Sequence, residues 1–121
     1  MLKELCNLYG GSGDEKSVRE YIIKQIENHC EYKVDNLGNI IAFKKGQETP
    51  DKKIMFSAHT DEVSFIITDI TDDGYLKFSS VGGIDASAVL NRVVCINNSI
   101  KGVIGTKAVH QLSADEKGVA L

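Results

Sequence analysis

The sequence predicts an α/β fold in which helices cover a mixed β-sheet that runs into a small β-barrel. Two amphipathic helical patterns come first, and several short apolar runs of strand type follow them, an order typical of helices layered on a sheet. From residue 81 the chain breaks into short β-rich pieces separated by glycine and asparagine, which is typical of a small barrel or sandwich. We therefore expect two regions, residues 1–80 and residues 81–121.

The spacing of apolar residues predicts both helices. Leucines recur every three residues near the amino terminus, which indicates a short amphipathic helix over residues 1–8. Val18, Ile22 and Ile26 recur every four residues and form one apolar stripe. This stripe predicts a second, longer helix over residues 14–29.

Three glycines between positions 10 and 13 interrupt the helical pattern. They do not indicate a phosphate-binding loop, because no strand precedes them and no Lys-Ser or Lys-Thr closes the pattern: Glu15, and not glycine, stands before Lys16 and Ser17. Ser12 and Glu15 have instead the Ser-x-x-Glu spacing of a capping box. We expect these two side chains to begin the second helix.

Two β-hairpins are predicted in the first region. Residues 31–35 and 39–43 flank an Asn-Leu-Gly turn, and residues 63–70 and 75–79 flank a turn that ends in Asp-Gly. A polar loop, residues 44–53, follows the first hairpin.

The second region contains two short strand pieces, residues 93–96 and 102–104. Near the end of the chain, Ser113 and Glu116 have the spacing of a further helix start. Little chain follows them, so we expect this end to fray.

The chain is organised around an apolar run, Ile54–Ala58, that leads directly into His59 and Asp61. Its β-branched and aromatic residues predict a buried strand, and sites in α/β folds lie beyond the carboxyl ends of strands. A neutral imidazole is a good ligand for zinc or cobalt, and a nearby carboxylate can hold its other ring nitrogen. The alternative is a histidine that closes the strand, followed by solvated acidic residues of a turn. The motif alone leaves both interpretations open.

The composition is that of an ordinary globular domain. The 121 residues are 42% hydrophobic and 26% charged, which predicts one domain with a sizeable buried core. A net charge of −3 argues against nucleic acid as the main partner. No apolar run is long enough to span a membrane, and the start does not have the pattern of a signal peptide. The three cysteines have no CxxC spacing, so a reducing cytoplasm is the expected compartment.

The segment Ala58-His59-Thr60-Asp61-Glu62-Val63 resembles the Ala-His-x-Asp-Glu-[Ile/Val] signature of the glutamyl aminopeptidase family. This family includes the tetrahedral and deblocking aminopeptidases, and some members carry the name cellulase or endoglucanase. Other stretches resemble family motifs in the same order along the chain: Leu2–Glu20, Asp35–Asn39, Val81–Asp85 and Lys101–Gly105. The sequence departs from the family at Tyr9, where relatives have proline.

The resemblance implies a metal-dependent aminopeptidase that cleaves amino-terminal residues from peptides. It implies two divalent ions per subunit, zinc or cobalt, with His59 as the first metal ligand and Asp61 as the catalytic acid that orients this ligand. The family's remaining ligands and its general-base glutamate would follow residue 121, and nothing in the sequence places His110 near His59. Residues 81–121 would begin a β-barrel insertion through which relatives form homo-oligomers.

Three interpretations of the chain remain open. The chain is the amino-terminal part of a metallo-aminopeptidase and is inactive alone, or it is a non-catalytic remnant that binds sister chains. The third, an unrelated binding domain, is disfavoured by the ordered motif matches. Exposed sheet edges predict a homo-oligomer with contacts over residues 81–110, and a monomer whose edges are blunted by Lys101 and Lys107 is the alternative.

Overall fold

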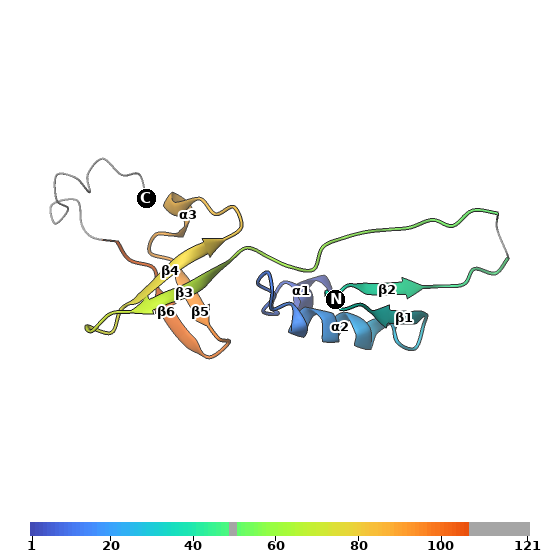
Figure 1. The fold of residues 1–121 in the computed structure, drawn as a ribbon, viewed down its shortest axis with the longest axis horizontal. Coiled ribbons are helices and arrows are strands. Elements are labelled where there is room, and N and C mark those ends of the chain that lie inside the picture. The colour runs from blue at the N-terminus through green and yellow to red at the C-terminus, as the bar shows by residue number, and fades with distance from the viewer. Residues whose placement is uncertain (49–50, 107–121) are drawn as a thin grey trace. The chain divides into compact units, whose positions relative to one another are not determined.

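The computed structural model describes residues 1–48 and 51–106 (Figure 1). The chain divides into two compact units, Met1–Gly82 and Gly83–Leu121. The described residues contain helices and antiparallel strands, as the sequence predicts in outline.

Both helices of the first unit are shorter than the apolar spacing predicts. Helix α1 spans Leu2–Leu5 and helix α2 spans Lys16–Ile26. Gly13 has a φ angle of 93°, which lies outside the right-handed helical region, so α2 begins only after it. The chain leaves α2 through a turn in which the His29 backbone N–H donates to the Ile26 carbonyl oxygen.

The first predicted hairpin is confirmed. Strands β1 (Glu31–Val34) and β2 (Ile40–Phe43) pair antiparallel, with Val34 opposite Ile40. The Asp35 carboxylate organises the turn, because its Oδ1 accepts hydrogen bonds of 2.9 Å from the backbone N–H groups of both Leu37 and Asn39. Such an aspartate holds a turn without help from the rest of the fold.

The second hairpin is confirmed as well. Strands β3 (Ser64–Ile70) and β4 (Leu76–Val81) pair antiparallel, with a bulge between Ile67 and Asp69. Phe65 and Phe78 meet edge to face across the strands, with ring centroids 4.8 Å apart. Gly74 adopts a φ of 83° in the connecting turn, a backbone conformation that glycine adopts readily.

The apolar run before the histidine does not form the predicted buried strand. Residues 53–58 have no assigned secondary structure, and the exposed fractions of Ile54, Met55 and Phe56 are 84%, 88% and 93%. A strand is stabilised by backbone hydrogen bonds to a neighbour. Every described strand is already paired in a two-stranded antiparallel sheet, and none of these sheets includes this run. For the same reason the described residues do not form one mixed sheet.

The second unit begins with a short helix and a hairpin. Helix α3 spans Ala86–Val89, and the Asp85 carboxylate caps it by accepting a 2.9 Å hydrogen bond from the Ser87 backbone N–H. Strands β5 (Val93–Ile96) and β6 (Ile100–Val103) pair antiparallel, so the second predicted strand begins two residues earlier than expected.

Asparagines make the β5–β6 turn possible. Asn97 and Asn98 have φ angles of 48° and 56°, and asparagine tolerates this left-handed conformation better than most residues. Residues 83–106 contain one two-stranded sheet, and they do not close into a barrel.

The predicted sizeable core is wrong for the described residues. Among their hydrophobic side chains only Val18 and Ile104 are buried, each with 7% of its surface exposed. Two-stranded sheets leave one or both faces open to solvent, which explains why so few side chains are covered. His110, Ser113 and Glu116 lie outside the described residues.

Candidate functional site

His59 and Asp61 lie together, as the His-x-Asp spacing predicts. The Nδ1 atom of His59 is 3.0 Å from Oδ1 of Asp61 and 3.0 Å from the backbone carbonyl oxygen of Asp61. Both of these oxygens only accept hydrogen bonds when the carboxylate is ionised, so Nδ1 is the ring nitrogen that carries the proton. In the neutral imidazole the lone pair is then on Nε2. The His59 side chain is 86% exposed, so this nitrogen is accessible from solvent.

The Asp61 carboxylate also receives a hydrogen bond from Ser12, whose Oγ donates to Oδ2. The two carboxylate oxygens therefore have different partners, Ser12 on one and His59 on the other. The Ser12 hydrogen bond, followed by the one with His59, holds the pKa of Asp61 below its ordinary value. Asp61 is consequently an anion at neutral pH.

The predicted capping box is wrong. The residue at the N-cap of α2 is Glu15, and no side chain caps the helix. Ser12 donates to Asp61 instead, and Oε1 of Glu15 accepts a 2.6 Å hydrogen bond from the Gly13 backbone N–H. The Ser-x-x-Glu pattern failed because a carboxylate is a stronger hydrogen-bond partner for the serine than a helical amide.

The glycines bring this loop close to the His-x-Asp segment. The Glu62 backbone N–H donates to the Gly10 carbonyl oxygen at 2.8 Å, and Gly11 forms a parallel β-bridge with Glu62. Gly11 is buried, and a Cβ atom there would lie 2.7 Å from Oγ of Ser64. A side chain at position 11 would push the loop away from the segment, so the glycines serve a close backbone approach.

The described residues fit one part of a metal centre. The Nε2 atom of His59 is an imidazole donor whose ring is held by a carboxylate, the arrangement common to metal-binding histidines. Within residues 1–48 and 51–106, however, no group of three or more His, Cys, Asp or Glu side chains is placed to hold a metal ion. Catalytic zinc sites generally use three protein ligands. Among the described residues, His59 is thus a candidate for a single ligand and Asp61 for the acid that orients it.

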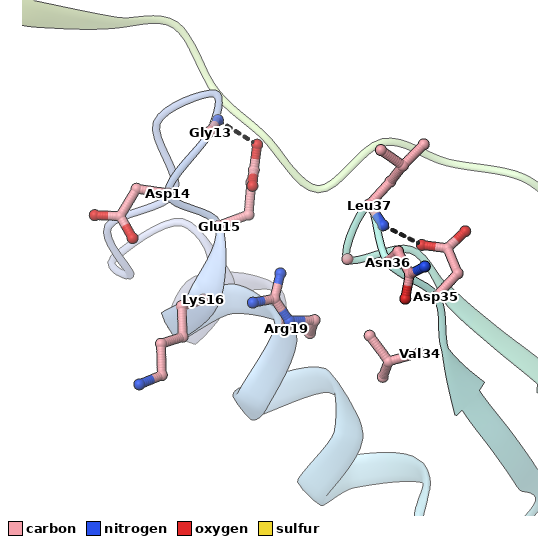
Figure 2. Close-up of a pocket in the computed structure, with 10 residues that line it drawn as sticks. Gly13, Asp14, Glu15, Lys16, Arg19, Val34, Asp35, Asn36 and Leu37 are labelled. Atoms are coloured by element: carbon pink, nitrogen blue, oxygen red, sulfur yellow. Dashed lines mark hydrogen bonds between the residues drawn. The ribbon is translucent and has the colours of Figure 1, made fainter.

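A shallow polar pocket of about 310 Å³ lies elsewhere in the first unit, between the start of α2 and the β1–β2 turn (Figure 2). Arg19 leans over this turn, and a Cβ atom at Gly38 would lie 2.7 Å from Nη1 of Arg19. His59 and Asp61 do not line the pocket, so we do not assign it to their chemistry.

Comparison with known proteins identifies the family. The family model described as M42 glutamyl aminopeptidase matches residues 38–120. The chain belongs to this family. A protein of Acetivibrio thermocellus that carries the name aminopeptidase is 41% identical over 125 aligned residues, which cover 100% of this chain and 35% of that protein. The chain spans about a third of the length of the curated relatives it matches.

Solved structures of M42 relatives have the same fold over this length. A TET aminopeptidase from the marine sediment archaeon Thaumarchaeota archaeon SCGC AB-539-E09 matches with a TM-score of 0.82 and 33% identity, covering 99% of this chain and 34% of that one. The TET1 peptidase of Pyrococcus horikoshii matches with a TM-score of 0.74 and 40% identity, covering 99% and 36%. That peptidase assembles into a tetrahedron or a large octahedral shell.

The sequence predicts that His59 and Asp61 lie together, but it gives no sign that Ser12 contacts Asp61. Forty-nine positions separate Ser12 from Asp61, and no local pattern connects them. The dense glycines were the available signal, because they indicate that the backbone approaches another segment closely. The structure also has no helix among its described residues that is long and apolar enough to cross a membrane.

Proposed function

We propose that this chain carries the first metal ligand of an aminopeptidase that hydrolyses amino-terminal peptide bonds at a dinuclear metal centre. The single observation that supports this most strongly is the contact between His59 Nδ1 and Asp61 Oδ1 within a chain of the M42 family. Two divalent ions, zinc or cobalt, would activate a water molecule and polarise the scissile carbonyl.

His59 and Asp61 have separate tasks in this proposal. Asp61 accepts the Nδ1 proton, which fixes the ring orientation and the tautomer and leaves Nε2 to bind metal. The negative charge of Asp61 also stabilises the positive charge that metal binding draws onto the ring. The remaining ligands and the general base would come from residues outside this sequence.

We also propose that residues 1–80 form part of the peptidase domain and that residues 81–121 begin a β-barrel insertion. The division into compact units near Gly82 supports the boundary. Assembly of the Pyrococcus horikoshii TET1 peptidase into shells supports a homo-oligomer here, with contacts over residues 81–110. Light scattering at low micromolar concentration measures this, and a folded monomer would contradict it.

The 121-residue chain alone is proposed to be inactive toward peptides, since its described residues supply one ligand. The alternative function is that of a non-catalytic module that binds sister chains. The extensively exposed apolar residues, including Ile66, Ile70 and Phe78, are the observation that favours this alternative.

Cys6, Cys30 and Cys95 form no disulfide, which supports the cytoplasm as the compartment.

A chimaera tests the enzymatic proposal. The 121 residues replace the corresponding third of the archaeal TET aminopeptidase, and hydrolysis of aminoacyl substrates and bound metal are measured. We expect an active, metal-loaded protein, and we expect His59→Ala to remove about one of the two metals per subunit together with the activity. His29→Ala is the control, because His29 is exposed just after α2 and outside the site. Unchanged metal content and rate in His59→Ala would refute the assignment.

A further inference from the structure

The hydrogen bond from Ser12 to Asp61 links two distant parts of the first unit through the candidate site. Ser12 Oγ donates to Oδ2 of Asp61, while Oδ1 of the same carboxylate faces Nδ1 of His59. An ionised carboxylate has no proton to give, so the serine hydroxyl must be the donor. The three side chains thus form one chain of hydrogen bonds that ends at the imidazole.

Ser12 is held in place independently of its side chain. The residues before it are fixed by the Glu62 N–H to Gly10 carbonyl hydrogen bond and by the bridge between Gly11 and Glu62. The residue after it, Gly13, donates its backbone N–H to the Glu15 carboxylate at 2.6 Å. The hydroxyl is therefore presented to Asp61 by a loop whose backbone is fixed on both sides.

Asp61 needs such a partner because it is only partly covered. Its side chain is 40% exposed, and the terminal torsion of an aspartate has a broad, roughly two-fold preference. A carboxylate held at one oxygen alone can rotate and exchange its histidine contact for water. Hydrogen bonds at both oxygens restrict this rotation.

We propose that Ser12 is a positioning residue that holds the Asp61 carboxylate against Nδ1 of His59, and thereby keeps His59 in the Nδ1–H tautomer with Nε2 directed to a metal. This inference rests on the proposed function and adds a residue to it. Groups that orient metal-binding histidines contribute about 10–100-fold to metal affinity or activity. Ser12 acts through Asp61 and does not contact the histidine itself, so we expect a smaller loss, roughly 3–10-fold in cobalt affinity, for Ser12→Ala.

The test uses the metal-free 121-residue chain and its Ser12→Ala, Ser12→Thr and Ser17→Ala variants. Ring nitrogen chemical shifts of His59, measured by NMR at mildly alkaline pH, report the tautomer directly. We expect Nδ1–H to dominate in the parent chain and to fall in Ser12→Ala. Ser12→Thr keeps a hydroxyl and should restore the parent tautomer. Ser17→Ala, a serine substitution within α2, should leave it unchanged.

The backbone amide signals of Gly11 and Glu62 show whether Ser12 positions the Asp61 carboxylate or only holds the glycine loop against residues 59–62. If Ser12→Ala shifts the His59 tautomer while these amides stay in place, the proposal is supported. An unchanged His59 tautomer in Ser12→Ala would overturn the proposal. Loss of the Gly11 and Glu62 signals in Ser12→Ala would also overturn it if Ser12→Thr failed to restore the tautomer. Cobalt titration of the same samples separates the two proposals. If His59 is not a metal ligand, cobalt does not bind at His59 in the parent chain. If Ser12 does not position Asp61, the parent chain and Ser12→Ala bind cobalt with equal affinity.

Discussion

Two neighbouring stretches of this chain differ in how the rest of the structure contacts them. Residues 59–62 are polar and sit against the glycine loop, where Asp61 and Glu62 both find hydrogen-bond partners. Residues 54–56, two positions before them, are apolar, yet their exposed fractions are 84–93%. The polar stretch needs only a few partners, and residues 10–13 provide them. The apolar stretch needs a sheet on which to pack, and the described residues offer it none. Only two residues thus separate the hydrogen-bonded polar stretch from the exposed apolar one.

Asp61→Asn in the chimaera removes the charge behind His59 while preserving the size of the side chain. We expect more metal to be retained than in His59→Ala but the rate of peptide hydrolysis to fall by roughly 10–100-fold, because the amide is a weaker hydrogen-bond acceptor for the imidazole than a carboxylate. Metal analysis and steady-state rates on the same sample check this. Asp73→Asn, in the β3–β4 turn, is the matched control. A rate within twofold of the parent would show that residue 61 does not orient the histidine.

Substitutions in the core and in the apolar run should differ in their effect on stability. Val18→Ala removes two methyl groups from a buried site, and we expect it to lower the free energy of unfolding by about 2 kcal/mol. Ile54→Ala removes more carbon from a site that is 84% exposed, so its effect should be below about 0.5 kcal/mol.

Urea unfolding of the 121-residue chain and both variants, followed by circular dichroism, measures this difference. Equal losses of stability from Val18→Ala and Ile54→Ala would mean that the apolar run packs in solution. That result would remove the contrast between the two stretches.

The β1–β2 turn supplies the smallest expected effect. Hydrogen bonds from the Asn39 side chain and the backbone N–H groups of Asn39 and Leu37 hold the pKa of Asp35 below its ordinary value. A carboxyl whose folded pKa is lowered stabilises the fold above its unfolded pKa of about 3.9, and this contribution is lost as the pH falls through the folded pKa. The Leu37 and Asn39 amide signals should therefore shift below about pH 4. Asp35→Asn should abolish that pH dependence, and its persistence would assign it to another group.

The hairpins and the contact between His59 and Asp61 could be predicted because their signals are local. Asp35 and Gly38 specify their turn within a few residues, and His59 and Asp61 are two positions apart. Ser12 could not be assigned from sequence, because its partner lies 49 positions away and the nearer capping pattern offered a plausible competitor.

The fate of Ile54–Phe56 could not be predicted for a different reason. Its β-branched and aromatic residues are typical of a buried strand. The pattern indicates that the run needs a neighbouring strand, but it does not indicate whether one is available. Likewise, the spacing of Val93–Ile96 and Ile100–Val103 predicts strands but does not determine whether their hairpin becomes part of a closed barrel.

Cobalt titration of the isolated chain, followed through the imidazole NMR signals of His59 and His29, is the sharpest test of whether His59 binds a metal ion. Both histidines are exposed, but only His59 has a carboxylate at Nδ1 that leaves Nε2 as the donor. We predict that cobalt broadens the His59 signals before those of His29, with a dissociation constant weaker than micromolar because one protein ligand leaves the other positions to water. Equal broadening of both histidines, or none at His59, would contradict its assignment as a metal ligand. Submicromolar binding accompanied by peptide hydrolysis would contradict the claim that the isolated chain supplies only one ligand.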